Sequence, residues 1–177
     1  MSILVIAEHD NSALKGSTLN TVAAATKISG DITLMVAGHN IDSVIDEAKT
    51  IDSIGNILKC DDELYANAIA EELSSLVLSN CEGFTHILAP SSTFGKNLMP
   101  RISAKLDAQQ ISDIISVESD DTFKRPIYAG SCIATVKSND SVKVITVRTT
   151  AFDAVALSNE NVNVDEISSN NSQGISK

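Results

Sequence analysis

The chain of 177 residues has little of what nucleic-acid-binding and membrane proteins need. Tryptophan is absent, aromatic residues make up only 3%, and the formal net charge is −10. Few aromatic side chains leave few platforms on which bases could stack, and the negative charge opposes phosphate backbones and anionic lipid surfaces. No apolar run approaches the length of a membrane-spanning helix. We therefore expect no nucleic-acid partner and no membrane insertion.

Cysteines are few and widely spaced, at Cys60, Cys81 and Cys132. Their odd number, without a CxxC or Cys/His cluster, supports neither a disulfide framework nor a zinc site. Buried free thiols in a reducing compartment are the simpler interpretation. The chain begins Met1-Ser2 and passes at once into an apolar segment, with no basic or Arg-rich presequence before it. We expect a cytoplasmic protein, or a mitochondrial matrix protein if it is eukaryotic and processed.

Glycine-rich nucleotide motifs are also missing. The GxGxxG fingerprint is absent because no two of the eight glycines are two positions apart; they are Gly16, Gly30, Gly38, Gly55, Gly83, Gly95, Gly130 and Gly174. There is no GxSxG nucleophile elbow. Gly95-Lys96 opens a helical pattern, but Pro90 and Asn97 stand where a Walker loop needs glycine and Ser or Thr.

What the sequence does contain is a repeated strand–helix pattern. The chain is 43% hydrophobic, enough for one well-cored domain. Strand-like segments at 3–7, 32–37, 56–59 and 86–89 alternate with helical patterns, two of which Ser17 and Asp42 are expected to cap. Such units in a row, with short connections, predict a parallel sheet with right-handed crossovers.

The pattern changes after Leu106. Residues 110–117 predict one more strand, and strands at 123–128, 132–137 and 142–147 follow with only turns between them. We predict an α/β, three-layer domain over residues 1–154, with a mostly parallel sheet and an antiparallel hairpin or meander as an extension. Beyond it, residues 155–177 are polar and predict a linker or frayed end rather than a second domain.

The segment 85–106 is the best candidate for a functional edge. A buried strand ends at Pro90, a polar turn follows, and a helix comes next. Open α/β sheets bind ligands or partners at the carboxyl ends of their strands. Ser91, Ser92 and Lys96, at a helix N-terminus, could hold a carboxylate or a phosphate. The alternative is that they cap the helix and face a protein partner.

Four further positions are predicted to hold this edge, the following strand and the hairpin together, as interface or structural residues. They are Phe94, Arg101, Asp113 and Arg125. The alternative is that they are ordinary surface residues.

Catalytic and metal-binding patterns are weak. His9 ends the first strand and is the one histidine worth testing as an acid or base, although a polar loop residue is the simpler role. The run Asp61-Asp62-Glu63 allows a metal site or the solvated start of a helix. Adjacent side chains point in different directions, which favours the helix start. The sequence therefore predicts no catalytic residue and no metal ligand.

Five stretches of the sequence together carry a family resemblance. They are STLNTVAAATKISG, LMVAGHN, STFGKNLMPRISAKLDAQQISDIISV, FKRPIYAGSCIATVKS and VKVITVRTTAFDA. In this order they resemble the amino-terminal domain of electron transfer flavoprotein alpha subunits, over residues 3–154. One departure is Ser131, where the family would have Asn after the glycine. The larger departure is length, because the family's second domain, which binds FAD, would follow about where this sequence stops.

The resemblance implies a Rossmann-like fold of the adenine nucleotide alpha hydrolase type. It also implies a scaffold domain that docks on a beta subunit, which holds AMP in the family. The complete heterodimer carries FAD and moves electrons from dehydrogenases, such as acyl-CoA dehydrogenases, to a quinone oxidoreductase in the membrane. None of the family's flavin motifs occurs here, so we expect an electron-carrier subunit rather than an enzyme, without FAD binding by this chain alone.

Two other functions are left open by the residues alone. A free-standing adenine-nucleotide-binding module would use the loop 91–97, although that loop lacks the glycine pair that lets backbone amides wrap a triphosphate. A hydrolase would pair His9 with Ser91 or Ser92.

Overall fold

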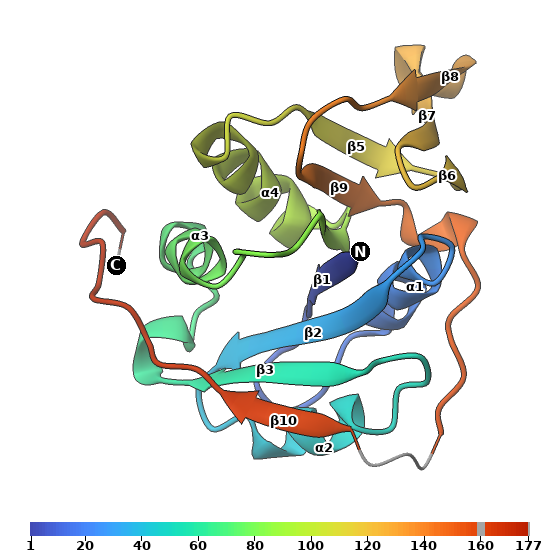
Figure 1. Cartoon of the computed structure of the whole chain (residues 1–177). Helices are drawn as coiled ribbons and strands as arrows, with labels where there is room; N and C mark the ends of the chain where they lie inside the picture. The colour runs from blue at the N-terminus through green and yellow to red at the C-terminus, as the bar shows by residue number, and fades with distance from the viewer. Residues whose placement is uncertain (159–161, 177) are drawn as a thin grey trace.

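A computed structural model describes residues 1–158 and 162–176. Its main sheet has the strand order β10-β3-β2-β1-β4-β9-β5, and every pairing in it is parallel (Figure 1). The strands are β1 Ser2–Ile6, β2 Asp31–Gly38, β3 Asn56–Asp61, β4 His86–Pro90, β5 Gln110–Ile114, β9 Lys143–Val147 and β10 Asn163–Glu166. Because parallel neighbours need long crossovers, the connections pass over the faces of the sheet.

Helices cover both faces and make three layers. Helices α1 (Gly16–Ala25) and α2 (Asp42–Ala48) pack on one face, and α3 (Ala70–Ser79) and α4 (Thr93–Lys105) pack on the other. Short 3-10 helices lie at η1 (Glu63–Tyr65), η2 (Tyr128–Gly130) and η3 (Thr149–Ala151). Strand side chains alternate between the two cores, as Ile3 and Leu4 do. Since both faces are buried, the central strand β1 is continuously apolar from Ile3 to Ile6.

A separate antiparallel sheet contains β6 (Ser116–Ser119), β7 (Thr122–Ile127) and β8 (Cys132–Lys137). Phe123 of β7 is fully buried in the α1/α2 core, and its register neighbours Val117 and Val136 pack against the same core. At the other end of the hairpin, Tyr128 and Ile133 are 79% and 53% exposed. The apolar residues of this region therefore divide between covering the main sheet and facing outward.

The predicted fold class is confirmed, but two strands were assigned wrongly. The predicted strand 110–117 is two strands, because a bulge follows Ile111 and the chain leaves the main sheet after Ile114. The predicted strand 142–147 does not belong to the antiparallel extension. It is β9, which runs parallel between β4 and β5. Its buried segment Val144–Val147 suits a central strand, which is packed on both faces.

Helix starts also differ from the prediction. Ser17 and Asp42 do not cap α1 and α2: the Ser17 hydroxyl donates to the Glu8 carboxylate, and Asp42 is the first residue inside α2. The predicted polar turn 91–97 is mostly helix, because α4 begins at Thr93.

Gly95 makes this early start of α4 possible. A Cβ at position 95 would lie 1.9 Å from the Pro90 carbonyl oxygen, so only glycine lets the helix approach β4 so closely.

The predicted frayed end is wrong for residues 162–176. Strand β10 lies within it and pairs in parallel with β3, from Asn163 opposite Asn56 to Glu166 opposite Lys59. Ile167, just beyond, packs against the α3/α4 core. The domain boundary at residue 154 and the role as a linker stay predictions. Among the described helices, none is long and apolar enough to cross a membrane.

Candidate functional site

The strand order reverses between β1 and β4, so the switch point lies at the carboxyl ends of these two strands. Side chains fill this place almost completely. The cavity there is lined by residues that include His9, Ala37, Ala68 and Phe94, and its volume is about 10 Å³. That is room for about one water molecule, and a nucleotide does not fit in it.

His9 stands at this switch point with both ring nitrogens engaged. Its Nε2 lies 3.1 Å from the Ala37 carbonyl oxygen, which can only accept, so Nε2 donates. Its Nδ1 accepts from the Asn11 amide at 3.1 Å. Burial lowers the pKa of His9, which favours this neutral form. Through these two hydrogen bonds His9 joins the loop after β1 to the end of β2, and neither ring nitrogen is free to act as a base.

Ser91 and Ser92 lie between the end of β4 and the start of α4. Their hydroxyl oxygens are buried and have no hydrogen-bond partner within the described residues. Ser92 is the N-cap residue, yet its side chain makes no capping bond. Lys96 is exposed on the first turns of α4. The helix start is therefore uncapped, His9 forms no hydrogen bond with either serine in the described structure, and the anion site stays a prediction.

Asp113 forms a second polar centre at the same edge of the sheet. It sits in the β5 bulge with φ of 62°, a left-handed conformation that is uncommon for residues other than glycine. Its Oδ2 accepts from Arg148 Nε at 3.0 Å, and Arg148 Nη2 also contacts this oxygen. The Asp113 amide donates to Thr146 Oγ1.

Burial alone would raise the pKa of Asp113. The hydrogen bonds from Arg148 and the positive charges of Arg148 and Lys96 outweigh burial and hold that pKa below its ordinary value. Ser91 lies close enough to contribute in the same direction, although its Oγ makes no hydrogen bond of normal geometry. Asp113 is thus a carboxylate that joins the ends of β5 and β9 at neutral pH.

The other three predicted positions connect neighbouring elements. Phe94 on α4 packs half-buried against the α3/α4 core. Arg101 places Nη2 2.8 Å from Glu71 Oε1 and so joins α4 to α3. Arg125 donates through Nε to the Ser112 carbonyl at 2.7 Å and joins the small sheet to β5.

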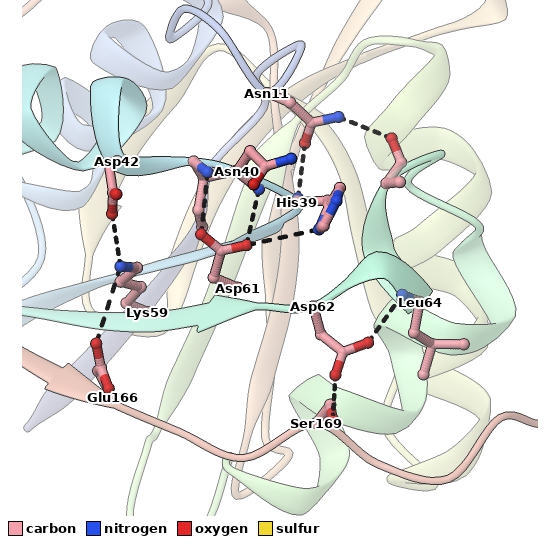
Figure 2. Close-up of polar contacts among 12 residues, drawn as sticks. Asn11, His39, Asn40, Asp42, Lys59, Asp61, Asp62, Leu64, Glu166 and Ser169 are labelled. Atoms are coloured by element: carbon pink, nitrogen blue, oxygen red, sulfur yellow. Dashed lines mark hydrogen bonds and ion pairs between the residues drawn. The ribbon is translucent and has the colours of Figure 1, made fainter.

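The acidic run at the end of β3 organises loops, as Figure 2 shows. Asp61 accepts from the amides of Asn40 and Ile41 at 2.7 and 3.1 Å, just before α2, and lies 3.9 Å from His39 Nδ1. Asp62 caps η1 by accepting from the Leu64 amide at 2.9 Å. In the part of the chain that the structure describes, no cluster of three or more His, Cys, Asp or Glu residues could hold a metal ion.

Sequence reasoning missed Arg148, which binds Asp113, and Glu72 of α3, which binds the segment after β10. Arg148 follows β9 directly, so its place at the carboxyl edge could have been found once β9 was recognised as a parallel strand. Glu72 had no local signal, because the amide that its carboxylate binds belongs to Gln173, 101 positions away.

The strand order and the two helical layers define a Rossmann-like α/β domain, with an antiparallel sheet inserted before β9. The family description "Electron transfer flavoprotein domain" matches residues 3–171. The chain belongs to the electron transfer flavoprotein family, which confirms the resemblance found in the sequence.

Several curated relatives show the same relationship. The chain is 51% identical over 168 residues to the electron transfer flavoprotein subunit alpha of Pseudomonas aeruginosa, covering 95% of this chain and 54% of the relative. It is 46% identical over 158 residues to the mitochondrial alpha subunit of Dictyostelium discoideum, covering 85% and 44%. For the alpha subunit of Paracoccus denitrificans the identity is 40% over 154 residues, covering 87% and 50%. The chain spans about half the length of these relatives.

Proposed function

We propose that this chain is the amino-terminal scaffold half of an electron transfer flavoprotein alpha subunit. The observation that carries the proposal is the match itself. It covers 95% of this chain but only 54% of the Pseudomonas aeruginosa alpha subunit. The α/β domain supports a scaffold role, because its polar networks join loops and strands to one another, as Asp61 and Asp113 do.

The complete protein would be a heterodimer with a beta subunit that holds AMP. It would act as an electron carrier between dehydrogenases, such as acyl-CoA dehydrogenases, and a quinone oxidoreductase. Its place would be the cytoplasm of a bacterium or the mitochondrial matrix, in keeping with bacterial and mitochondrial relatives.

FAD does not fit the switch-point cavity of this chain. The switch-point cavity holds about 10 Å³, and its lining residues are mostly apolar. The glycine fingerprint that would bring backbone amides to a pyrophosphate is missing from the sequence. In the proposed function the flavin is bound by the other half of the alpha subunit, and this half contributes rigid support.

Co-purification tests the docking. We would co-express the chain with the beta subunit of the same source, with an affinity tag on the beta subunit, and measure the complex by light scattering. The expected result is a one-to-one complex that contains AMP and no flavin. Separate elution of the two proteins at micromolar concentration would contradict the proposal.

One observation favours the nucleotide-binding module as a second candidate. The hydroxyls of Ser91 and Ser92 are unpaired, within the described residues, beside an uncapped helix start with Lys96 on its first turns. If this is a phosphate site, calorimetry should detect ATP or AMP binding that Lys96→Ala abolishes. Equal heats from the chain and from a buffer blank would remove this candidate.

A further inference from the structure

The segment after β10 lies along α3, although nothing in its polar sequence predicts a fixed position. Figure 1 shows the C-terminus beside α3, on the same side of the sheet as α4. We name residues 167–176 the carboxyl-terminal strap. It begins at Ile167, whose amide donates to the Lys59 carbonyl at 2.8 Å, and continues with the Ser169 hydroxyl, which donates to Asp62 at 2.7 Å (Figure 2).

Glu72 of α3 is the buried end of this contact. It is only 2% exposed, and within the described residues no Lys, Arg or His forms an ion pair with it. Its carboxylate accepts from the Gln173 amide at 2.9 Å to each oxygen, and from the Ser172 hydroxyl at 2.9 Å. Burying a carboxylate without hydrogen-bond partners destabilises the folded state. The strap supplies these partners to Glu72, so each of the two segments stabilises the position of the other.

Two serines on α3 extend the surface that Glu72 begins. Ser75 and Ser79 follow Glu72 at helical spacing and face the same way. The Asn170 side-chain amide donates to Ser75 at 3.1 Å and to Ser79 at 3.0 Å, and the Gln173 side-chain amide donates to Ser75 at 3.2 Å.

The strap also reaches a residue of the protein interior. The backbone amide of Asn170 donates to the hydroxyl of Tyr65 at 3.2 Å, and Tyr65 is 1% exposed. The strap therefore forms hydrogen bonds with a row of polar side chains on α3 and with Tyr65 of η1.

We propose that Glu72 anchors a docking surface on α3 whose partner is the carboxyl-terminal strap, and that this anchor fixes the position of residues 167–176 on the domain. The strand β10 has only four residues and lies at the sheet edge, so its pairing with β3 is a weak hold by itself. The strap gives the chain a second attachment beyond that edge. Gln173 and Ile175 then form part of the wall of a groove of about 750 Å³ between α3 and α4.

Native-state hydrogen exchange of the full chain tests this proposal at the Asn170 amide, a reporter that none of the substitutions changes chemically. Gln173→Pro deletes the N–H that Glu72 accepts and leaves α3 untouched, whereas Gln173→Ala keeps that N–H and serves as its control. Glu72→Ala removes the anchor from the other side. Its control is Glu71→Gln, since Glu71 is the neighbour that pairs with Arg101 instead.

Losing the charge-assisted bond should speed exchange of the Asn170 amide about tenfold or more in Gln173→Pro and Glu72→Ala. In the two controls the rate should stay within about threefold of the unmodified chain, because the anchoring bond is retained. Unchanged exchange in Gln173→Pro would overturn the proposal, whether or not Glu72→Ala folds. An equal acceleration in both controls would also overturn it, because the effect would then not depend on the Glu72 carboxylate.

Discussion

Phe123→Ala is the substitution that we expect to separate the small sheet from the main one. Phe123 is fully buried in the α1/α2 core, between Val117 and Val136. It is the one fully buried residue of strands β6, β7 and β8. Truncating a buried Phe to Ala costs about 3–5 kcal/mol, from lost transfer energy and the cavity left behind. That is a large share of the roughly 5–15 kcal/mol of a typical domain.

Urea unfolding followed by circular dichroism measures this cost through the midpoint and the slope. In a thermal unfolding scan of the same variant, the melting temperature should fall by about 6–20 °C for a chain of this length. Ile133→Ala is the control from the same hairpin, because Ile133 is 53% exposed and should cost about 1 kcal/mol or less. If the two variants lose similar stability, the small sheet is not held by Phe123 and the reasoning fails.

Two further predictions concern a close approach and a buried histidine. Gly95→Ala places a Cβ 1.9 Å from the Pro90 oxygen and should cost about 1–3 kcal/mol or more, whereas Gly16→Ala, with nothing within 4 Å, should be neutral or stabilising. Matching urea midpoints for the two would refute this. Burial lowers the pKa of His86, so the unfolded chain binds the proton first. Stability is therefore full above the ordinary value of 6.5 and falls with pH toward the lowered native pKa, by at most about 1.4 kcal/mol per pH unit. His86→Gln should flatten that fall in unfolding free energies measured between about pH 7.5 and 5, and an unaltered slope would show that other groups cause it.

Local patterns were sufficient to predict the central layers of the fold. Residues 3–7 and 87–89 are continuously apolar because helices cover both faces of the sheet, so the burial of these strands can be seen in the sequence. The place of β9 was harder to predict, because the crossover from β5 to β9 runs through the antiparallel sheet instead of a helix. The sequence showed that 142–147 is a strand, but not that it pairs with β4 and β5.

The edge strand and the site depended on long-range partners. Strand β10 is a polar segment whose position is set by β3, more than 100 positions earlier, so no local period identifies it. His9 lies in the loop just after β1, near the strand end where it was predicted, yet its neutral state follows from burial and from the Asn11 amide that donates to its Nδ1. The Asp113 carboxylate likewise reaches Arg148 because of a bulge in β5, which no glycine or proline in the local sequence predicted.

Thermal unfolding of the purified chain, with FAD, AMP and ATP each added in excess, tests whether this half of the protein binds a flavin by itself. A ligand at about a hundred times its dissociation constant stabilises the fold by about 2.7 kcal/mol, which is a shift of roughly 5–11 °C at this chain length. We expect no shift with FAD, because the switch point is filled by side chains such as Phe94 and His9. A saturable, stoichiometric shift with FAD would contradict this expectation and place a flavin site within this half of the protein.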